Sequence, residues 1–278
     1  MVSMLWVAKK WASSATKSPS PVRVRHDTRA PQPCKLCCRV LKLVNSHIIP
    51  EFCHAATYPP KPGLHRFHYM PDVDAGEEKW EQQGFKEYLL CEQCDNEKLA
   101  AWEEHATGLF KTQMPQPAAG QAQPILFHDP DYSSLKLFFL SVLWRAGVST
   151  HPFYEHVRLG PHEDKIRDML FGNIPGDPTD YGCVVSLLLD RGQLLRDVLV
   201  QPTPCGIQDP EHDRYLFVFG GFLFLYFISK EGLIPKLQQS MLKKDGTLTI
   251  VPAEYDDFAV LRDLRKRAAG SVRNPLTE

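Results

Sequence analysis

The sequence lacks an apolar run long enough to cross a membrane. A membrane-spanning helix needs about 20 apolar residues, and the nearest candidate, Tyr215 to Ser229, is shorter and is interrupted by Gly220-Gly221. Two buried strands joined by a Gly-Gly turn explain this segment better than a membrane span does. We therefore expect no association with a membrane.

The chain also lacks an excess of charge of either sign, because 32 Lys and Arg residues oppose 33 Asp and Glu residues. The net charge of −1 gives no overall positive field that would attract nucleic acid or anionic lipid. This balance excludes a histone-like or polybasic binder, although a local basic patch is compatible with it. With 43% apolar and 23% charged residues, the composition is that of a soluble globular protein that can bury its own core.

A secretory signal is not evident, because the short apolar stretch from Met4 to Ala8 is followed, rather than preceded, by Lys9-Lys10. Residues 1–30 carry six basic residues and one acidic residue among scattered Ser, Thr and Pro. This composition is typical of a disordered basic tail, and an organelle-targeting peptide is the alternative. Without an export signal, we expect the protein to be cytoplasmic, in a compartment that keeps thiols reduced.

Four of the eight cysteines form two C-x-x-C pairs, with 53 residues between the pairs. Two thiolates separated by two residues on a tight turn point into one half of a tetrahedral shell, so two such pairs can close a four-cysteine zinc site. In a reducing compartment this spacing favours structural zinc over disulfides; a redox pair and two pairs of buried thiols are the alternatives. The predicted ligands are Cys34, Cys37, Cys91 and Cys94, with Cys38 as an alternative to Cys37.

A low-complexity segment rich in Pro, Gln and Ala at residues 112–124 divides the chain. It predicts a linker between a zinc-binding domain at residues 31–111 and a second domain, of unknown role, at residues 125–278. The mixture of helical and strand-like patterns predicts an α+β fold class. The sequence shows no internal repeat and no glycine-rich loop of the kind that cradles a nucleotide.

In the first domain, the hydrophobic pattern predicts a short strand from Val40 to Val44, a strand from Tyr88 to Leu90 and a helix after Cys94. The helix is indicated by apolar residues at three- and four-residue steps, with acidic residues off that face. Asp95 and Asn96 are expected to cap its N-terminus. The apolar positions are Leu99, Trp102, Ala106 and Leu109.

In the second domain, a strongly apolar segment from Tyr132 to Arg145 predicts a buried helix. Another helix is expected after Gly160, with Pro161 at its first position and acidic residues in its first turn. The last predicted helix runs from Glu254 to Ala269 and is basic at its end. The strands expected between these helices are Cys183–Leu189, Val198–Gln201, Tyr215–Phe219, Phe222–Ile228 and Thr247–Val251.

The order of motifs in the first domain resembles that of a known family. A C-x-x-C pair and an apolar strand lead to Ser46-His47-Ile48-Ile49-Pro50, and the second C-x-x-C pair is followed by Asp95-Asn96 and the helix. This order resembles the zinc-containing HNH, or ββα-metal, endonucleases, in which treble-clef zinc knuckles frame a β-hairpin and a helix. The resemblance covers residues 31–110 and implies that the C-terminal domain is an addition to that unit.

The resemblance implies an activity and a set of site residues. His47 would be the general base that deprotonates the water attacking a phosphodiester of DNA or RNA, since a neutral imidazole is available near pH 7. Asp95, with Asn96 as a second candidate, would help to hold a catalytic Mg²⁺ or Mn²⁺. The Zn²⁺ ion would be structural.

The sequence also departs from the family pattern. Ser46 stands where many members have an aspartate, Asp95 stands where they have Asn or His, and no clear Asn precedes the second C-x-x-C pair. The predicted domain is acidic, with 8 Lys or Arg and 12 Asp or Glu between residues 31 and 110. Since phosphate contacts supply most of the affinity for nucleic acid, a positive groove would need the tail, the basic last helix or another subunit.

The alternative function is a non-catalytic zinc-binding module that binds a protein or nucleic-acid partner, and the C-terminal domain could provide a further protein-binding surface. In that interpretation His47 packs on the hairpin. Asp95 and Asn96 then serve the helix terminus alone.

Two further clusters are candidate sites with simpler interpretations. A second zinc site would use Cys53 with nearby histidines, although histidines in loops are more commonly solvated. An active site at the end of the first helix of the second domain would use Arg145, although an Arg that pairs with a nearby acid is the simpler interpretation. The histidines are His54, His65 and His68 in the first cluster, and His151 and His156 beside Trp144 in the second.

Overall fold

The computed structural model describes residues 30–54, 66–72, 77–82, 84–110, 123–128, 131–196, 198–205, 214–229, 233 and 235–271. The predicted tail up to residue 29 and the predicted linker up to residue 122 lie outside these ranges, as does His65. No helix within these ranges combines the length and the apolar character that crossing a bilayer requires.

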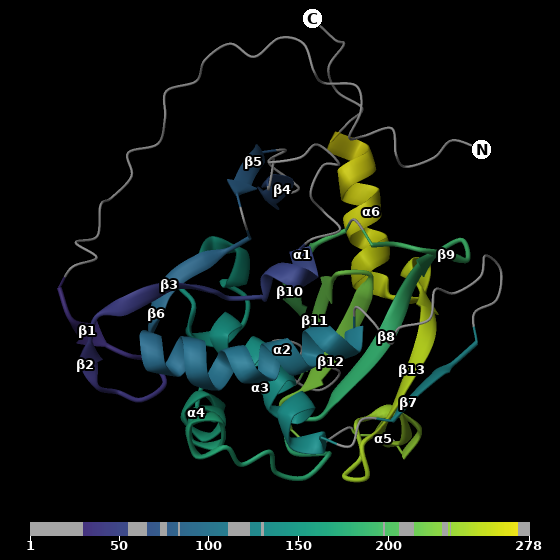
Figure 1. Ribbon diagram of the computed structural model, residues 1–278. Coiled ribbons are helices and arrows are strands. Elements are labelled where there is room, and N and C mark those ends of the chain that lie inside the picture. Colours follow the sequence, from purple (N-terminus) through teal and green to yellow (C-terminus); the bar gives the residue numbers. More distant parts are fainter. Residues whose placement is uncertain are drawn as a thin grey trace, which may run out of the picture.

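The N-terminal segment consists of three small antiparallel pairs of strands followed by a helix (Figure 1). Its elements are β1 (Gln32–Pro33), β2 (Val40–Leu41), β3 (Leu43–His47), α1 (Glu51–His54), β4 (Arg66–Asp72), β5 (Glu77–Gln82), β6 (Lys86–Cys91), η3 (Cys94–Leu99) and α2 (Ala100–Gly108). The pairs are β1 with β2, β3 with β6, and β4 with β5. The predicted strand around Leu89 and the predicted helix after Cys94 are therefore confirmed.

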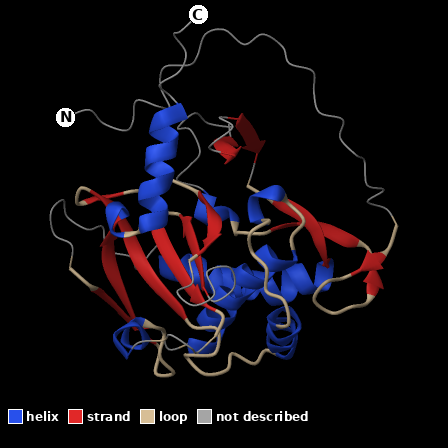
Figure 2. Cartoon of the chain, turned by 180° about the vertical axis from the view of Figure 1, so that it is seen from behind, coloured by secondary structure: helices blue, strands red, loops and turns tan. Residues whose placement is uncertain are grey.

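The C-terminal segment is a mixed sheet with helices on both faces (Figures 1 and 2). Its elements are β7 (Ile125–His128), α3 (Tyr132–Val148), η5 (Pro152–Tyr154), α4 (His162–Gly172), β8 (Cys183–Asp190), β9 (Gln193–Leu194), β10 (Val200–Pro204), β11 (Arg214–Phe219), β12 (Phe222–Phe227), α5 (Pro235–Ser240), β13 (Thr247–Glu254), η6 (Tyr255–Asp257) and α6 (Ala259–Ser271). The strand order is β10-β11-β12-β8-β13-β7, and β9 pairs with β8. Among the strands that the structure describes, only β13 and β8 run parallel. Together the two segments confirm the α+β class.

The alternation of side chains along β11 separates two apolar layers, because successive residues of a strand point to opposite faces of the sheet. Phe217 and Phe219 belong to the main core, which includes α3. Leu216 and Val218 belong to a smaller cluster that includes Leu261 of α6. The sheet therefore has α3 on one face and the start of α6 on the other.

The main core is continuous between the two segments of the chain. It includes Leu90 of β6 and Trp102 of α2, together with side chains of α3 and of the large sheet. The ring of Phe110, just after α2, lies 5.1 Å from that of Phe222 and 6.4 Å from that of Phe138. The N-terminal segment is thus packed against the C-terminal sheet and α3 through one shared core.

Helix α3 runs through the middle of this core and is buried on nearly all sides. Asp131 caps its N-terminus by accepting a hydrogen bond of 3.0 Å from the Ser134 backbone N–H. A helix that is apolar all round is stable only when it is enclosed by other elements, and here α2, α4 and the sheet enclose it. The predicted buried helix from Tyr132 is confirmed, and it extends to Val148.

The predicted Gly-Gly turn joins β11 and β12. Phe219 pairs with Phe222 across it, and both Gly220 and Gly221 have positive φ angles, of 63° and 85°. A two-residue turn of this type needs a left-handed backbone at both positions, which glycine adopts without strain. The segment that most resembled a membrane span is therefore a buried hairpin.

Among the boundaries that differ from the prediction, three change where an element begins. β10 begins at Val200 and runs on to Pro204 because it pairs with β11 up to Tyr215. The last helix begins at Ala259 rather than Glu254, because β13 continues to Glu254 along β8 and a short capped turn follows it. Pro161 precedes α4 as its N-terminal cap residue and is not its first helical residue.

Candidate metal centre and active site

The four predicted zinc ligands are gathered in one place. The sulfur atoms of Cys34, Cys37, Cys91 and Cys94 all lie within 4.8 Å of one another. The Sγ atoms of Cys37 and Cys91 are 3.8 Å apart, which is about the sulfur–sulfur spacing in a tetrahedron with Zn–S bonds of about 2.3 Å, and far longer than a disulfide bond of about 2.05 Å. The cluster is therefore positioned to hold a metal ion and is compatible with structural zinc.

Backbone hydrogen bonds form the first C-x-x-C turn and attach it to β6. The Cys38 N–H donates to the Cys34 carbonyl over 2.8 Å, and the Cys91 N–H donates to the Cys34 sulfur over 3.3 Å. Cys38 has a φ of 61° and an exposed side chain. Of the two adjacent candidates, Cys37 is thus the one whose sulfur lies in the cluster.

The electrostatic environment differs among the four thiols. Burial raises the pKa of Cys34, and burial together with the charge of Cys34 raises the pKa of Cys94. Burial also opposes ionisation of Cys37, but hydrogen bonds from Arg39 and the neighbouring thiols outweigh it and lower its pKa to about 6. Four thiolates in one buried cluster repel one another, so a bound divalent cation would stabilise them together.

The antiparallel pair of β3 and β6, which we call the β3–β6 hairpin although α1, β4 and β5 lie between its strands, has two distinct ends. Leu43 lies opposite Cys91 at what we call the cysteine end, and His47 lies opposite Lys86 at the histidine end. A bulge between Val44 and Asn45 shifts the register between them. His47, the predicted general base, is therefore the last residue of its strand, and it is half-buried.

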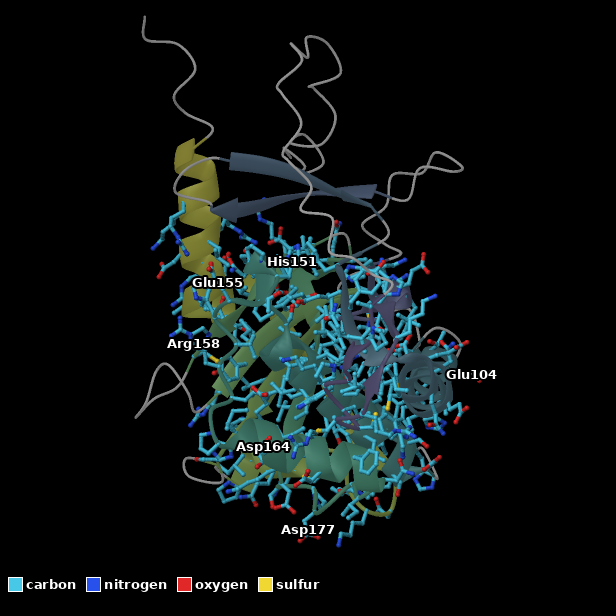
Figure 3. All side chains as sticks on the ribbon, turned by 90° about the vertical axis from the view of Figure 1, so that its left-hand side faces the viewer. Glu104, His151, Glu155, Arg158, Asp164 and Asp177 are labelled. Carbon is cyan, nitrogen blue, oxygen red and sulfur yellow. The ribbon has the colours of Figure 1, made fainter. Side chains whose placement is uncertain are left out.

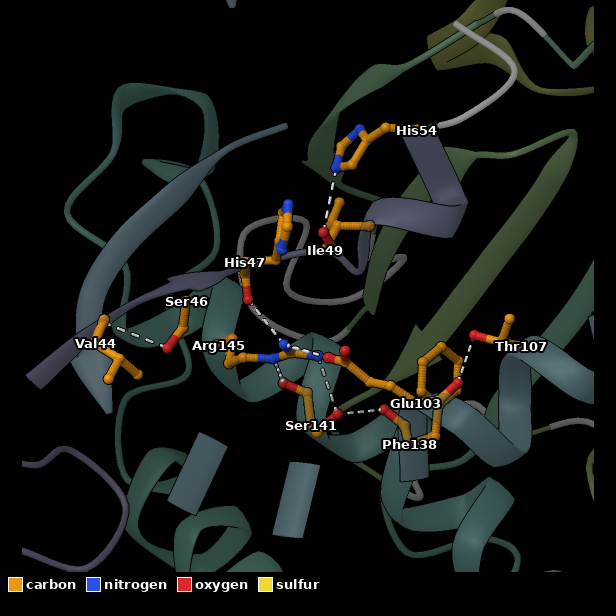
Figure 4. Close-up of polar contacts among 10 residues, drawn as sticks. All are labelled: Val44, Ser46, His47, Ile49, His54, Glu103, Thr107, Phe138, Ser141 and Arg145. Atoms are coloured by element: carbon orange, nitrogen blue, oxygen red, sulfur yellow. Dashed lines mark hydrogen bonds and ion pairs between the residues drawn. The ribbon is translucent and has the colours of Figure 1, made fainter. Parts of the chain in front are cut away.

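At the histidine end, two imidazole rings lie against the backbone of Gly84 (Figure 4 shows the two histidines). A Cβ atom at Gly84 would be 2.8 Å from Cδ2 of His54 and 3.3 Å from Cδ2 of His47, and the φ of Gly84 is +76°. His54 is fully buried, and its Nε2 lies 3.2 Å from the Ile49 carbonyl oxygen. Burial, followed by the charge of His47, lowers the pKa of His54 to about 4, so His54 is neutral at neutral pH.

Arg145 of α3 connects the histidine end to two helices (Figure 4). Its Nη1 donates to the backbone carbonyl of His47 over 2.8 Å and lies 2.6 Å from Oε1 of Glu103 on α2. Its Nε donates to the Ser141 carbonyl over 3.2 Å. The simpler interpretation of Arg145, a buried arginine paired with an acid, is therefore confirmed. That its partners would be Glu103 and the backbone of His47 was not foreseen.

Two more contacts hold the histidine end against the C-terminal segment. The Glu87 carboxylate of β6 accepts a hydrogen bond of 2.6 Å from the Ser149 hydroxyl and another of 3.1 Å from the Thr150 N–H, just after α3. The ring of Phe85 stacks on that of Phe153 at 4.3 Å. These contacts could not be predicted from the sequence Gly84-Phe85-Lys86-Glu87 before the second cysteine pair, because it contains no recognisable motif.

The structure corrects the predicted caps of the helix that follows the second cysteine pair. The helical segment begins at Glu92, and Gln93 already has helical backbone angles, so neither Asp95 nor Asn96 caps it. Asp95 is half-buried and Asn96 is exposed, both in the first turn at the cysteine end. The acid that connects to His47, through Arg145, is Glu103, which lies about 12 Å further along the helix.

Within the described part of the chain, the four cysteines are the only group of three or more Cys, His, Asp or Glu side chains close enough to hold an ion. Of the predicted second zinc site, His65 and the side chain of His68 lie outside the described residues. Comparison with known proteins gave no matching family model, curated protein or solved structure. The function must therefore be argued from the site itself.

Proposed function

We propose that the protein is a metal-dependent, HNH-like endonuclease that hydrolyses phosphodiester bonds in DNA or RNA, and that its four cysteines hold a structural zinc ion in a treble-clef arrangement. The observation that supports the proposal is the position of His47. It ends one strand of a hairpin whose other strand leads into the second C-x-x-C pair, and this pair joins the first around one point.

In the proposed reaction, His47 accepts a proton from a water molecule as the water oxygen bonds to phosphorus. The bond between phosphorus and the leaving oxygen breaks, and that oxygen takes up a proton from solvent. A half-buried imidazole at a strand end suits this task, because it is oriented by the sheet and still reachable by water. Base catalysis of this kind contributes about 10²- to 10⁴-fold to a rate.

The proposal includes Mg²⁺ or Mn²⁺ as a cofactor with Asp95, and Asn96, as candidate ligands. No group of three such ligands other than the cysteines exists among the described residues. Mg²⁺, however, commonly keeps several waters and is held by one or two carboxylates together with substrate phosphates. A preformed cage is therefore not required, and the ion would neutralise charge on the phosphate when substrate is bound.

A plasmid-nicking assay with Mg²⁺ or Mn²⁺ tests the proposal directly. We expect His47→Ala to reduce the rate of cutting by about 10²-fold or more, while zinc content and thermal stability stay near those of the wild type. The matched control is His128→Ala, because His128 is an exposed histidine of β7 on the C-terminal segment. Equal cutting by wild type and His47→Ala would remove His47 from the mechanism.

The alternative, a non-catalytic zinc-binding interaction module, is favoured by the distribution of acids. Asp95 is at the cysteine end, whereas His47 is at the other. Glu104 of α2 is exposed on the surface (Figure 3), where it would repel phosphate. Folded, zinc-loaded protein that does not cut any nucleic acid with either metal ion would favour this function.

A further inference from the structure

Arg145 carries a positive charge in a largely apolar part of the protein. Its side chain is 1% exposed, and its neighbours on α3, including Leu143, Trp144 and Ala146, are buried as well. Burying an unpaired charge costs several kcal/mol, and even a buried ion pair is often no more stable than apolar residues of the same volume. Fold stability alone therefore gives little reason for an arginine at this position.

The hydrogen bonds of Arg145 join three elements at one point. The guanidinium contacts the end of β3 through the His47 carbonyl, α2 through Glu103, and its own helix through Ser141. The planar guanidinium presents its donors in a fixed fork, so it sets both the distance and the direction of its partners. Here the partner on β3 is the residue whose side chain is the candidate base.

The chain changes direction at His47. It is the last residue of β3, and after it the buried Ile48 and Ile49 carry the chain away towards the short helix α1. The Ile48 N–H is held by the Phe85 carbonyl at 3.0 Å on the β6 side. Arg145 holds the His47 carbonyl from the α3 side, so the peptide between His47 and Ile48 is fixed from both directions.

We propose that Arg145 is a positioning residue for His47, so that the C-terminal segment supplies part of the active site through α3. This inference rests on the proposed endonuclease function. Arg145 acts on the backbone of His47 and does not itself touch the substrate. A displacement of about 1 Å in a catalytic group can cost about 10²-fold in rate, so loss of the fork should lower kcat much more than it changes KM.

The test compares Arg145→Met, Arg145→Lys and the control Arg167→Met in full-length, zinc-loaded protein. Met removes the charge and the donors at similar volume, and Lys keeps the charge but not the fork. Arg167 is a partly exposed arginine of α4 that pairs with Asp164 and Asp168. We expect kcat to fall about 10- to 100-fold in Arg145→Met with KM changed less than about threefold, to be partly restored in Arg145→Lys, and to be unchanged in Arg167→Met.

NMR signals of the His47 ring give a second measurement that does not depend on cutting. We expect them to shift or broaden in Arg145→Met and Arg145→Lys, while the His156 signals stay as in the wild type. If Arg145→Met does not fold, Glu103→Gln replaces it, since it removes the charge that orients the guanidinium. Unchanged His47 signals in the folded variants, or a kcat equal to that of the wild type, would overturn the inference.

The two measurements separate this inference from the proposed function. If the wild type does not cut, the endonuclease function fails, and the catalytic part of the inference fails with it; the NMR signals then decide whether Arg145 fixes His47. If the wild type cuts but the Arg145 variants cut equally well, the function stands and the inference fails.

Discussion

The two ends of the β3–β6 hairpin are held in opposite ways. At the cysteine end, four sulfur atoms from within the N-terminal segment converge on one point. At the histidine end, side chains of the C-terminal segment join those of the N-terminal segment, and Arg145 is 98 residues away from His47 in the sequence. Short-range spacing therefore forms each cysteine pair, and pairing of β3 with β6 inside the N-terminal segment brings the pairs together. The surroundings of the candidate base depend instead on packing between the two segments.

Because of this difference, we expect that a substitution that disrupts one end leaves the structure of the other end largely unchanged. Loss of the metal should act first on the N-terminal segment, because all four cysteines lie in it. Loss of contacts at the histidine end should leave the four sulfur atoms in place. The following predictions examine this separation, from the largest expected effect to the smallest.

The largest effect is expected for Cys91→Ser, which removes a central sulfur of the cluster. Structural zinc contributes on the order of 10 kcal/mol to the folding of small zinc domains, so we expect loss of bound zinc and a large fall in the thermal stability of the N-terminal segment. Zinc content by metal analysis and thermal unfolding measure this. Cys38→Ser is the control, because Cys38 is adjacent but exposed, and it should keep both zinc and stability.

A chelator should reproduce the effect of Cys91→Ser on the wild type. Zinc retained at full occupancy in Cys91→Ser would contradict the assignment of the cluster as the metal centre.

The next effect concerns acid sensitivity at the histidine end. The pKa of His54 is about 4 in the folded protein, against about 6.5 for an unperturbed histidine. Between these values the unfolded chain binds more protons, so stability decreases as pH falls, by up to about 1.4 kcal/mol per pH unit and about 3 kcal/mol in all. Denaturant unfolding at several pH values, with zinc content monitored, measures the slope.

His54→Gln should reduce this slope even if it lowers stability at neutral pH, because glutamine does not titrate. The control is His156→Gln, at an exposed histidine, which should keep the wild-type slope. An unchanged slope in His54→Gln would place the acid sensitivity elsewhere, for example in the thiolates.

The smallest effect distinguishes two glycines of the N-terminal segment. Gly84→Ala places a methyl group 2.8 Å from the His54 ring on a backbone with positive φ, and it should destabilise the protein by about 1–3 kcal/mol. Gly108→Ala meets no atom within 4 Å at the end of α2, and it should stabilise the protein by about 0.5–1 kcal/mol. Both variants should keep zinc, as metal analysis would show; zinc loss in Gly84→Ala would mean that the two ends are coupled.

Features that depend on short-range patterns could be predicted from the sequence. The sulfur cluster follows from ligand spacing, the β11–β12 hairpin follows from Gly220-Gly221, and helix α3 follows from its apolar run. The predicted caps were wrong. A residue that caps a helix N-terminus must itself have non-helical backbone angles, and here the backbone is already helical at Gln93, before Asp95 and Asn96. The start of α6 was wrong because pairing with β8 extends β13 to Glu254.

The residues around His47 could not be predicted in this way. Glu103 looked like one of several solvent-facing acids of the helix, and the sequence did not indicate which acid Arg145 would pair with. Gly84 carried no motif at all. Their roles depend on which helix face packs against which strand. Hydrophobic periodicity predicts which face of a helix is buried, but not which other element that face contacts.

The sequence by itself determined the two C-x-x-C pairs that form the candidate metal site, the α+β class, and the helix and hairpin at the centre of the C-terminal segment. Each of these depends on residues a few positions apart or on one composition pattern. Only the tertiary structure decided that Arg145 of α3 donates a hydrogen bond to the backbone carbonyl of His47 and that Glu103 is its ion-pair partner. The physical reason is that a buried charge must find its partners wherever the packing brings them, and that packing depends on the whole chain.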